Sequence, residues 1–185
     1  MAQKKQDTGT NCLVLLVIII GALAFFGIKS CFRRSQSAPI EQHLSEYTSI
    51  RGLERQQAAE AYVRGKIVAV NQSERQMDDI YFDLPRELRA AQPEEVGTVV
   101  WLEWGADGIG MYTDGAGAYV HTCKVTIIDM SIPAIIAERD FRGSRPPETK
   151  SGSGSRYGSK PTDKIVDYLK DLPRKTLSTS ESVPA

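Results

Sequence analysis

Hydrophobic residues follow three successive patterns along this chain, and the first is an unbroken apolar run. Residues 12–28 contain no charged residue, and twelve of the seventeen are Leu, Ile, Val or Phe. A run that is apolar on all sides and flanked by basic residues is typical of a membrane-spanning helix. Basic residues at 29, 33 and 34 close it. We therefore predict a transmembrane anchor over 12–32, after an N-terminal tail over 1–11.

The second pattern is a series of short segments in which apolar and polar residues alternate, between residues 63 and 143. Alternation with a period of two predicts strands of a half-buried sheet. The expected strands are 66–70, 80–82, 98–104, 109–112, 119–130 and 134–141. A helical turn is expected over 85–91, and turns over 105–108 and 114–117. Because the connections look too short for parallel crossovers, we expect an antiparallel sandwich or a small barrel.

The third pattern is a helical stripe near the C-terminus, in the segment 161–173. Ile165, Tyr168, Leu169 and Leu172 recur at helical spacing, which predicts a short amphipathic helix. A helix of about ten residues is marginal alone in water. We expect its stripe to dock onto the β domain, which makes the fold class mainly-β (α+β) with one short C-terminal helix.

The remaining segments have no strong pattern. We interpret 33–62 as a spacer or stalk, 144–160 as a Gly/Ser/Pro linker, and 174–185 as a disordered tail. This order of anchor, spacer, small β domain, linker and helix resembles the layout of many bacterial envelope proteins. The resemblance implies no particular activity.

The anchor predicts a single-pass membrane protein that contacts lipid through its N-terminal helix. Lys and Arg are nearly balanced on the two sides of the run, and we favour a signal-anchor orientation that places the C-terminal domain outside the cytoplasm. Two alternatives stay open. The run is also compatible with a cleaved signal peptide, and the sequence before Cys31 partly matches a lipidation signal.

Charge is distributed unevenly, although the whole chain has a net charge of zero. Residues 65–143 contain 7 Lys and Arg against 13 Asp and Glu, a net charge of −6, whereas residues 144–185 contain 8 against 5, a net charge of +3. An acidic domain repels phosphate backbones. We therefore expect no nucleic-acid partner.

No catalytic, cofactor or metal signature stands out in the sequence, so we expect no cofactor and favour a protein without enzyme activity. His121 and Cys123 share one face of a predicted strand, but zinc needs about four ligands. Asp107 and Asp114 precede glycines, which is ordinary turn chemistry.

Two hypotheses about function follow. The first is a membrane-anchored, non-enzymatic binding or assembly module whose ligand the sequence does not specify. Its candidate binding aromatics are Trp101, Trp104, Tyr112 and Tyr119, which could contact a protein partner, a glycan or a membrane surface. The second is a membrane-tethered hydrolase whose site gathers dispersed carboxylates, such as Asp78, Asp79, Asp107 and Asp114. A deep pocket holding two carboxylates would favour the hydrolase, and a flat sheet with an exposed aromatic patch would favour the binding module.

Overall fold

The computed structural model describes residues 37–56, 60–149 and 151–176. The tail and anchor predicted over 1–32 lie outside these residues. No helix in the described ranges is long and apolar enough to cross a membrane. The chain divides into two compact units, and the second, Pro39–Ala185, contains the folded domain described below.

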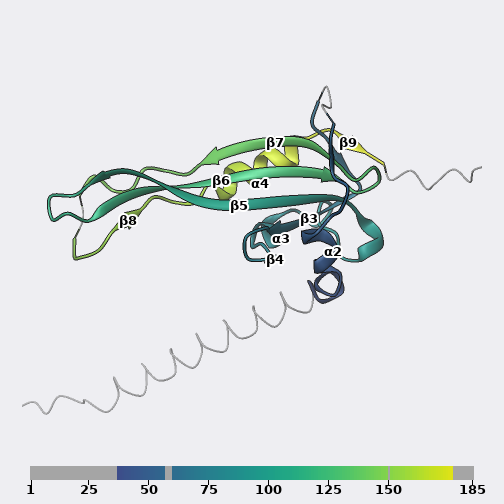
Figure 1. Cartoon of the computed structure of the whole chain (residues 1–185), viewed down its shortest axis with the longest axis horizontal. Helices are drawn as coiled ribbons and strands as arrows, with labels where there is room; N and C mark the ends of the chain where they lie inside the picture. Colours follow the sequence, from purple (N-terminus) through teal and green to yellow (C-terminus); the bar gives the residue numbers. More distant parts are fainter. Residues whose placement is uncertain (1–36, 57–59, 150, 177–185) are drawn as a thin grey trace, which may run out of the picture. The chain divides into compact units, whose positions relative to one another are not determined.

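The domain is built on one mixed sheet of seven strands (Figure 1). Its strands lie in the order β1 (Glu54–Arg55), β7 (Ala134–Arg142), β6 (Gly117–Asp129), β5 (Val96–Met111), β3 (Lys66–Asn71) and β4 (Gln76–Met77). The short strand β8 (Arg156–Tyr157) pairs with β6. A separate pair joins β2 (Val63–Arg64) to β9 (Arg174–Lys175).

The expected mainly-β domain is confirmed, but the antiparallel sandwich or small barrel is wrong. Strands β5, β6 and β7 are antiparallel neighbours, whereas β3 runs parallel to β5 and β1 runs parallel to β7. The connection over 72–95 carries β4, the helix α3 (Ile80–Asp83) and the 3-10 helix η1 (Pro93–Glu95). It is therefore long enough for the crossover that parallel strands need.

Two local predictions failed for a physical reason. The predicted strand over 80–82 is the helix α3, which begins where the Asp78 carboxylate accepts the backbone N–H of Ile80 at 2.9 Å. The predicted turn over 105–108 is absent, because β5 continues through it opposite β6. Tertiary pairing thus overrides the turn preference of these small residues.

Helices cover both faces of the sheet, and this gives the domain two hydrophobic clusters. One cluster packs α3 and α4 (Thr162–Asp171) against β5 and β6, and the other includes residues of α2 (Leu44–Thr48) on the opposite face (Figure 1). Ile165 and Leu169 of α4 are fully buried, and Leu172 is 9% exposed. The predicted docking of the helical stripe is confirmed.

A buried ion pair ties β2 to the end of β6. The carboxylate of Asp129, fully buried, accepts hydrogen bonds from Arg64 Nε and Tyr62 Oη at 2.8 Å each, and from Ser131. Burial alone would raise the pKa of Asp129, but the hydrogen bonds from Ser131, Arg64 and Tyr62 together outweigh it and lower the pKa. Because every partner is satisfied, this network holds β2 in place.

Candidate functional site

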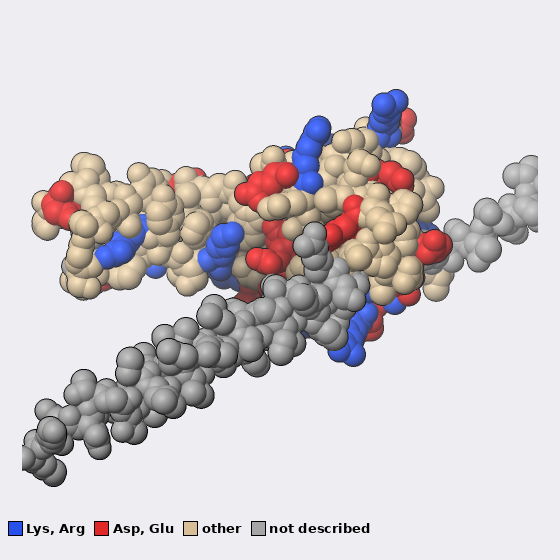
Figure 2. Space-filling model, turned by 90° about the horizontal axis from the view of Figure 1, so that it is seen from below, with Lys and Arg blue, Asp and Glu red and all other residues tan. Residues whose placement is uncertain are grey.

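The hairpin of β5 and β6 continues past both hydrophobic clusters as a long projection (Figure 1). We call it the arm and define it as residues 105–122 together with β8. Residues 105–111 are all exposed, although they belong to the same strand as the buried Val99 and Val100. The face of the molecule in Figure 2 shows few charged side chains on this projection, whereas the body is densely charged.

Aromatic stacking and close backbone packing hold the arm together. The ring of Tyr157 in β8 stacks on Tyr119 and on His121, with centroids 5.0 and 5.2 Å apart. Gly117 gives the Tyr119 ring its space, since a Cβ there would lie 2.5 Å from the ring. The backbone N–H groups of Gly143 and Gly158 donate to the carbonyls of His121 and Tyr119, which adds a third chain segment beside β6. The arm is thus a defined three-stranded ribbon.

Large apolar side chains are exposed on this ribbon. Met111 is 79% exposed, Tyr157 51% and Ile109 41%. In the described part of the chain only one other large apolar residue is exposed, Ile132 at 41%, in the turn between β6 and β7. Three of the four exposed large apolar residues of the described chain therefore lie on the arm.

The structure places the four predicted binding aromatics in different environments. Trp101 and Trp104 face opposite sides of the sheet, as their spacing predicts, and both are half-buried. Trp101 donates to the Tyr47 carbonyl at 2.7 Å, and Trp104 donates to Asp78 Oδ2 at 2.7 Å. Both indoles therefore pack within the domain.

The other two aromatics belong to the arm. Tyr119 lies in the stack, and the Tyr112 hydroxyl donates to the Pro147 carbonyl beside the hairpin turn. Sequence reasoning missed Tyr157, because it lies within the segment 144–160 that we interpreted as a linker. Two residues between serines and glycines give no alternation, so only pairing with β6 reveals β8 as a strand.

The carboxylates of the hydrolase hypothesis divide between two places. Asp78 and Asp79 line one hollow of about 440 Å³ beside Trp104 and Lys160. Asp107 lies on the arm, 3.4 Å from Arg142, and Asp114 accepts the N–H of Ala116 in the hairpin turn. The four are therefore not gathered at one site.

Both carboxylate oxygens of Asp78 accept hydrogen bonds from the domain itself. Its Oδ1 accepts the N–H of Ile80 at the start of α3, and its Oδ2 accepts the indole N–H of Trp104. The ammonium group of Lys160 lies 4.5 Å above the Trp104 ring. These contacts join α3, β5 and the segment before α4, which is a positioning role.

Cys123 and His121 make no nucleophile and base pair. Burial raises the pKa of the Cys123 thiol to about 12, so that the thiol stays protonated at neutral pH. His121 instead stacks on Tyr157. Among the described residues no group of three His, Cys, Asp or Glu could hold a metal ion.

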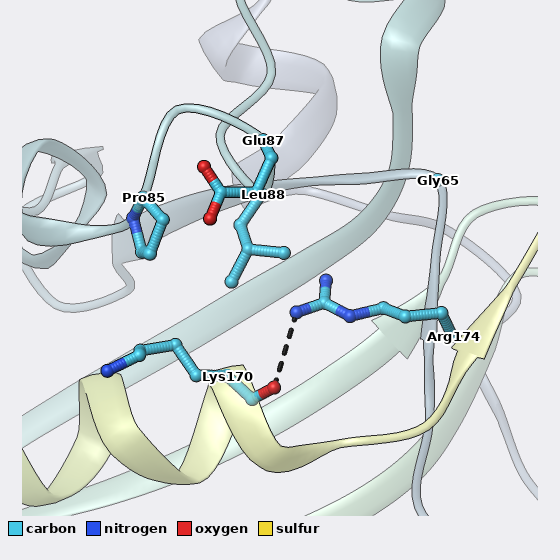
Figure 3. Close-up of a pocket in the computed structure, with 6 residues that line it drawn as sticks. All are labelled: Gly65, Pro85, Glu87, Leu88, Lys170 and Arg174. Atoms are coloured by element: carbon cyan, nitrogen blue, oxygen red, sulfur yellow. Dashed lines mark hydrogen bonds between the residues drawn. The ribbon is translucent and has the colours of Figure 1, made fainter.

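A second hollow, of about 520 Å³, lies between α4 and the loop after α3 (Figure 3). The guanidinium of Arg174 reaches toward Leu88 and donates to the Lys170 carbonyl at 3.4 Å. Desolvation lowers the pKa of Arg174, and the nearby Glu87 opposes this shift. A cation that binds a carbonyl of the last helical turn caps the C-terminal end of α4. The position of Arg174 in this hollow is therefore explained by its contact with the helix.

The geometry defines a class, an α+β domain with helices on both faces of a mixed sheet and an exposed β arm. Comparisons of this chain with protein-family models, with curated proteins and with solved structures find no match.

Proposed function

We propose that this protein is a membrane-anchored, non-enzymatic binding or assembly module, and that its arm contacts a protein partner. The observation that carries the proposal is the exposure of Ile109, Met111 and Tyr157 on one projection. Three of the four exposed large apolar residues in the described chain lie there. A partner that wraps the arm can bury the apolar area of these side chains.

Folding energetics support the same interpretation. A ribbon that lies outside the hydrophobic clusters buries little apolar area and still costs backbone entropy. Glycines such as Gly108 and Gly110 add to this cost. An arm of this kind contributes little to the stability of the domain, whereas a partner that covers its apolar side chains stabilises both.

The membrane part of the proposal rests on the sequence. The apolar run within 12–32 supplies the anchor, and the favoured orientation places the domain outside the cytoplasm. The net charge of −6 over 65–143 disfavours nucleic acid as the partner. The domain would then act close to the lipid surface.

Affinity capture from detergent-solubilised membranes tests the arm, with a matched pair of variants. Ile109 and Ile132 are equally exposed, at 41%, but only Ile109 lies on the arm. Ile109→Asp should remove most of the specifically captured protein, and Ile132→Asp should leave it unchanged. Equal capture by both variants would contradict the proposal.

A membrane-tethered hydrolase is the second candidate, because Asp78 and Asp79 line the same hollow. Asp79→Asn changes one carboxylate of this hollow and leaves the Asp78 contacts to Ile80 and Trp104 in place. If the full-length protein hydrolyses any of a panel of ester, peptide and glycoside substrates and Asp79→Asn abolishes the reaction, the hydrolase replaces the binding module.

A further inference from the structure

One edge of β5 loses its neighbour before the strand ends. Strand β3 pairs with β5 only as far as Leu102, where the Gln72 N–H donates to the Leu102 carbonyl at 3.0 Å. On the other side β6 continues to pair as far as Met111. No strand of the described ranges replaces β3 beyond Leu102. A register shift between Gly108 and Gly110 then interrupts the strand, so the open edge is 103–108, which we call the β5 edge.

Backbone groups along the β5 edge point outward at alternate residues. Ala106 faces His121 and Gly108 faces Tyr119 in the register of β5 and β6. The carbonyls of His121 and Tyr119 accept bonds from Gly143 and Gly158 on the far side of β6. These are therefore non-hydrogen-bonded pairs of the ladder, and Ala106 and Gly108 direct their N–H and C=O groups away from β6. An incoming strand can bond to them.

Side chains leave this edge accessible and make it acidic. Gly105, Ala106 and Gly108 offer at most a methyl group, so another backbone can approach closely. Glu103 and Asp107 lie on one face with only Gly105 between them, and both are exposed.

Nearby cations only partly neutralise the negative charge of Glu103 and Asp107. Lys124 lies opposite Glu103 but makes its salt bridge with Glu138, at 2.8 Å. Arg142 lies 3.4 Å from Asp107, and both side chains are more than half exposed. An exposed pair of this kind is weak and easily exchanged.

We infer that the β5 edge accepts an extended basic segment of a partner protein as an added strand. The inference rests on the proposed binding function and names its chemistry: backbone pairing with Ala106 and Gly108, and Lys or Arg side chains four residues apart that face Glu103 and Asp107.

Charge argues against a second copy of this chain on the same edge. Antiparallel self-pairing centred on Gly105 would place Glu103 of each copy opposite Asp107 of the other. Like charges directly opposite each other destabilise a strand pair. A basic strand turns the same two positions into attractive contacts.

Fluorescence anisotropy with the full-length protein in detergent micelles tests this inference. The probe is the blocked peptide Thr-Lys-Thr-Val-Thr-Lys-Thr-Val, and its control replaces both Lys residues by Glu. The basic peptide should bind at least tenfold more tightly than the acidic one. It should also slow amide exchange at Ala106 and Gly108 but not at Gly105 and Asp107, whose amides face β6.

Matched variants separate backbone pairing from charge. Ala106→Pro removes an outward N–H and should weaken peptide binding at least tenfold, whereas Ala106→Val keeps the N–H and should weaken it less than threefold. The double variant Glu103→Gln with Asp107→Asn retains the backbone and should reduce the preference for the basic peptide below threefold.

Three results would overturn the inference: equal binding of the two peptides, equal binding by the two Ala106 variants, or a dimer in light scattering that Ala106→Pro dissociates. The last result would assign the edge to a second copy. If Ile109→Asp still abolishes partner capture while the peptides bind equally, the proposed function stands and the edge inference alone fails.

Discussion

Docking of α4 onto the sheet is the feature whose energetic effect follows most directly from the structure. Leu169 is fully buried in the cluster that α4 shares with α3, β5 and β6. Leu169→Ala removes three buried carbon atoms and leaves a cavity that the surrounding sheet can only partly close. Substitutions of this kind cost about 2–5 kcal/mol of unfolding free energy. In a domain of this size that corresponds to a decrease in Tm of roughly 6–20 °C.

Thermal unfolding followed by circular dichroism measures this effect on the chain from Ser35 onward. Asp171→Ala is the matched control, since Asp171 is exposed at the last residue of α4. It should change the unfolding free energy by less than about 0.5 kcal/mol. Leu169→Asp should destabilise more than Leu169→Ala, because it also buries a charge. If Leu169→Ala and Asp171→Ala give the same Tm, α4 is not part of the folded unit.

The remaining predictions concern the anchor, the buried acid, the buried thiol and nucleic acid. Full-length protein should stay in the membrane fraction after carbonate extraction, with release into the supernatant as the contrary result, and the chain from Ser35 onward should be soluble. Asp129→Ala should cost roughly 3–5 kcal/mol at pH 7 in chemical denaturation, since it leaves Arg64 without its carboxylate. The pKa of Asp129 is lower in the folded chain than in the unfolded chain. The stabilisation that the Asp129 carboxylate contributes is therefore complete above its unfolded pKa of about 3.9, and it is lost as the pH falls through the folded pKa. The unfolding free energies of wild type and Asp129→Ala should converge at that low pH. Iodoacetamide at pH 8 should modify Cys123 only after unfolding, because the folded thiol is buried and its pKa is about 12. The domain should show no salt-sensitive DNA or RNA binding in filter retention, and submicromolar affinity at physiological salt would refute this.

Local patterns predicted the elements whose residues decide their own structure. The apolar, β-branched run at 66–70 is β3, the alternation after Tyr119 is β6, and the stripe at Ile165 and Leu169 is buried in α4 as expected. In each case the periodicity reports directly which side is buried.

Long-range pairing decided the features that the sequence could not predict. The parallel partnership of β3 and β5 depends on a crossover whose helix α3 looked like a strand. The arm exists because β5 continues through Gly105 and Gly108 against β6, where turn preference predicted a reversal. Tyr157 becomes part of the candidate site only by pairing across the sheet. None of these contacts leaves a local signal in the chain.

Photo-crosslinking in native membranes tests the central claim most directly, namely that the arm is the partner-binding surface. p-Benzoylphenylalanine is placed at Met111 on the arm, or at Ile132 in the β6–β7 turn as the control; these residues are 79% and 41% exposed. Irradiation should give a discrete adduct of higher mass from position 111, lost in the Ile109→Asp background, and none from position 132. No adduct from position 111, or the same adducts from both positions, would contradict the account.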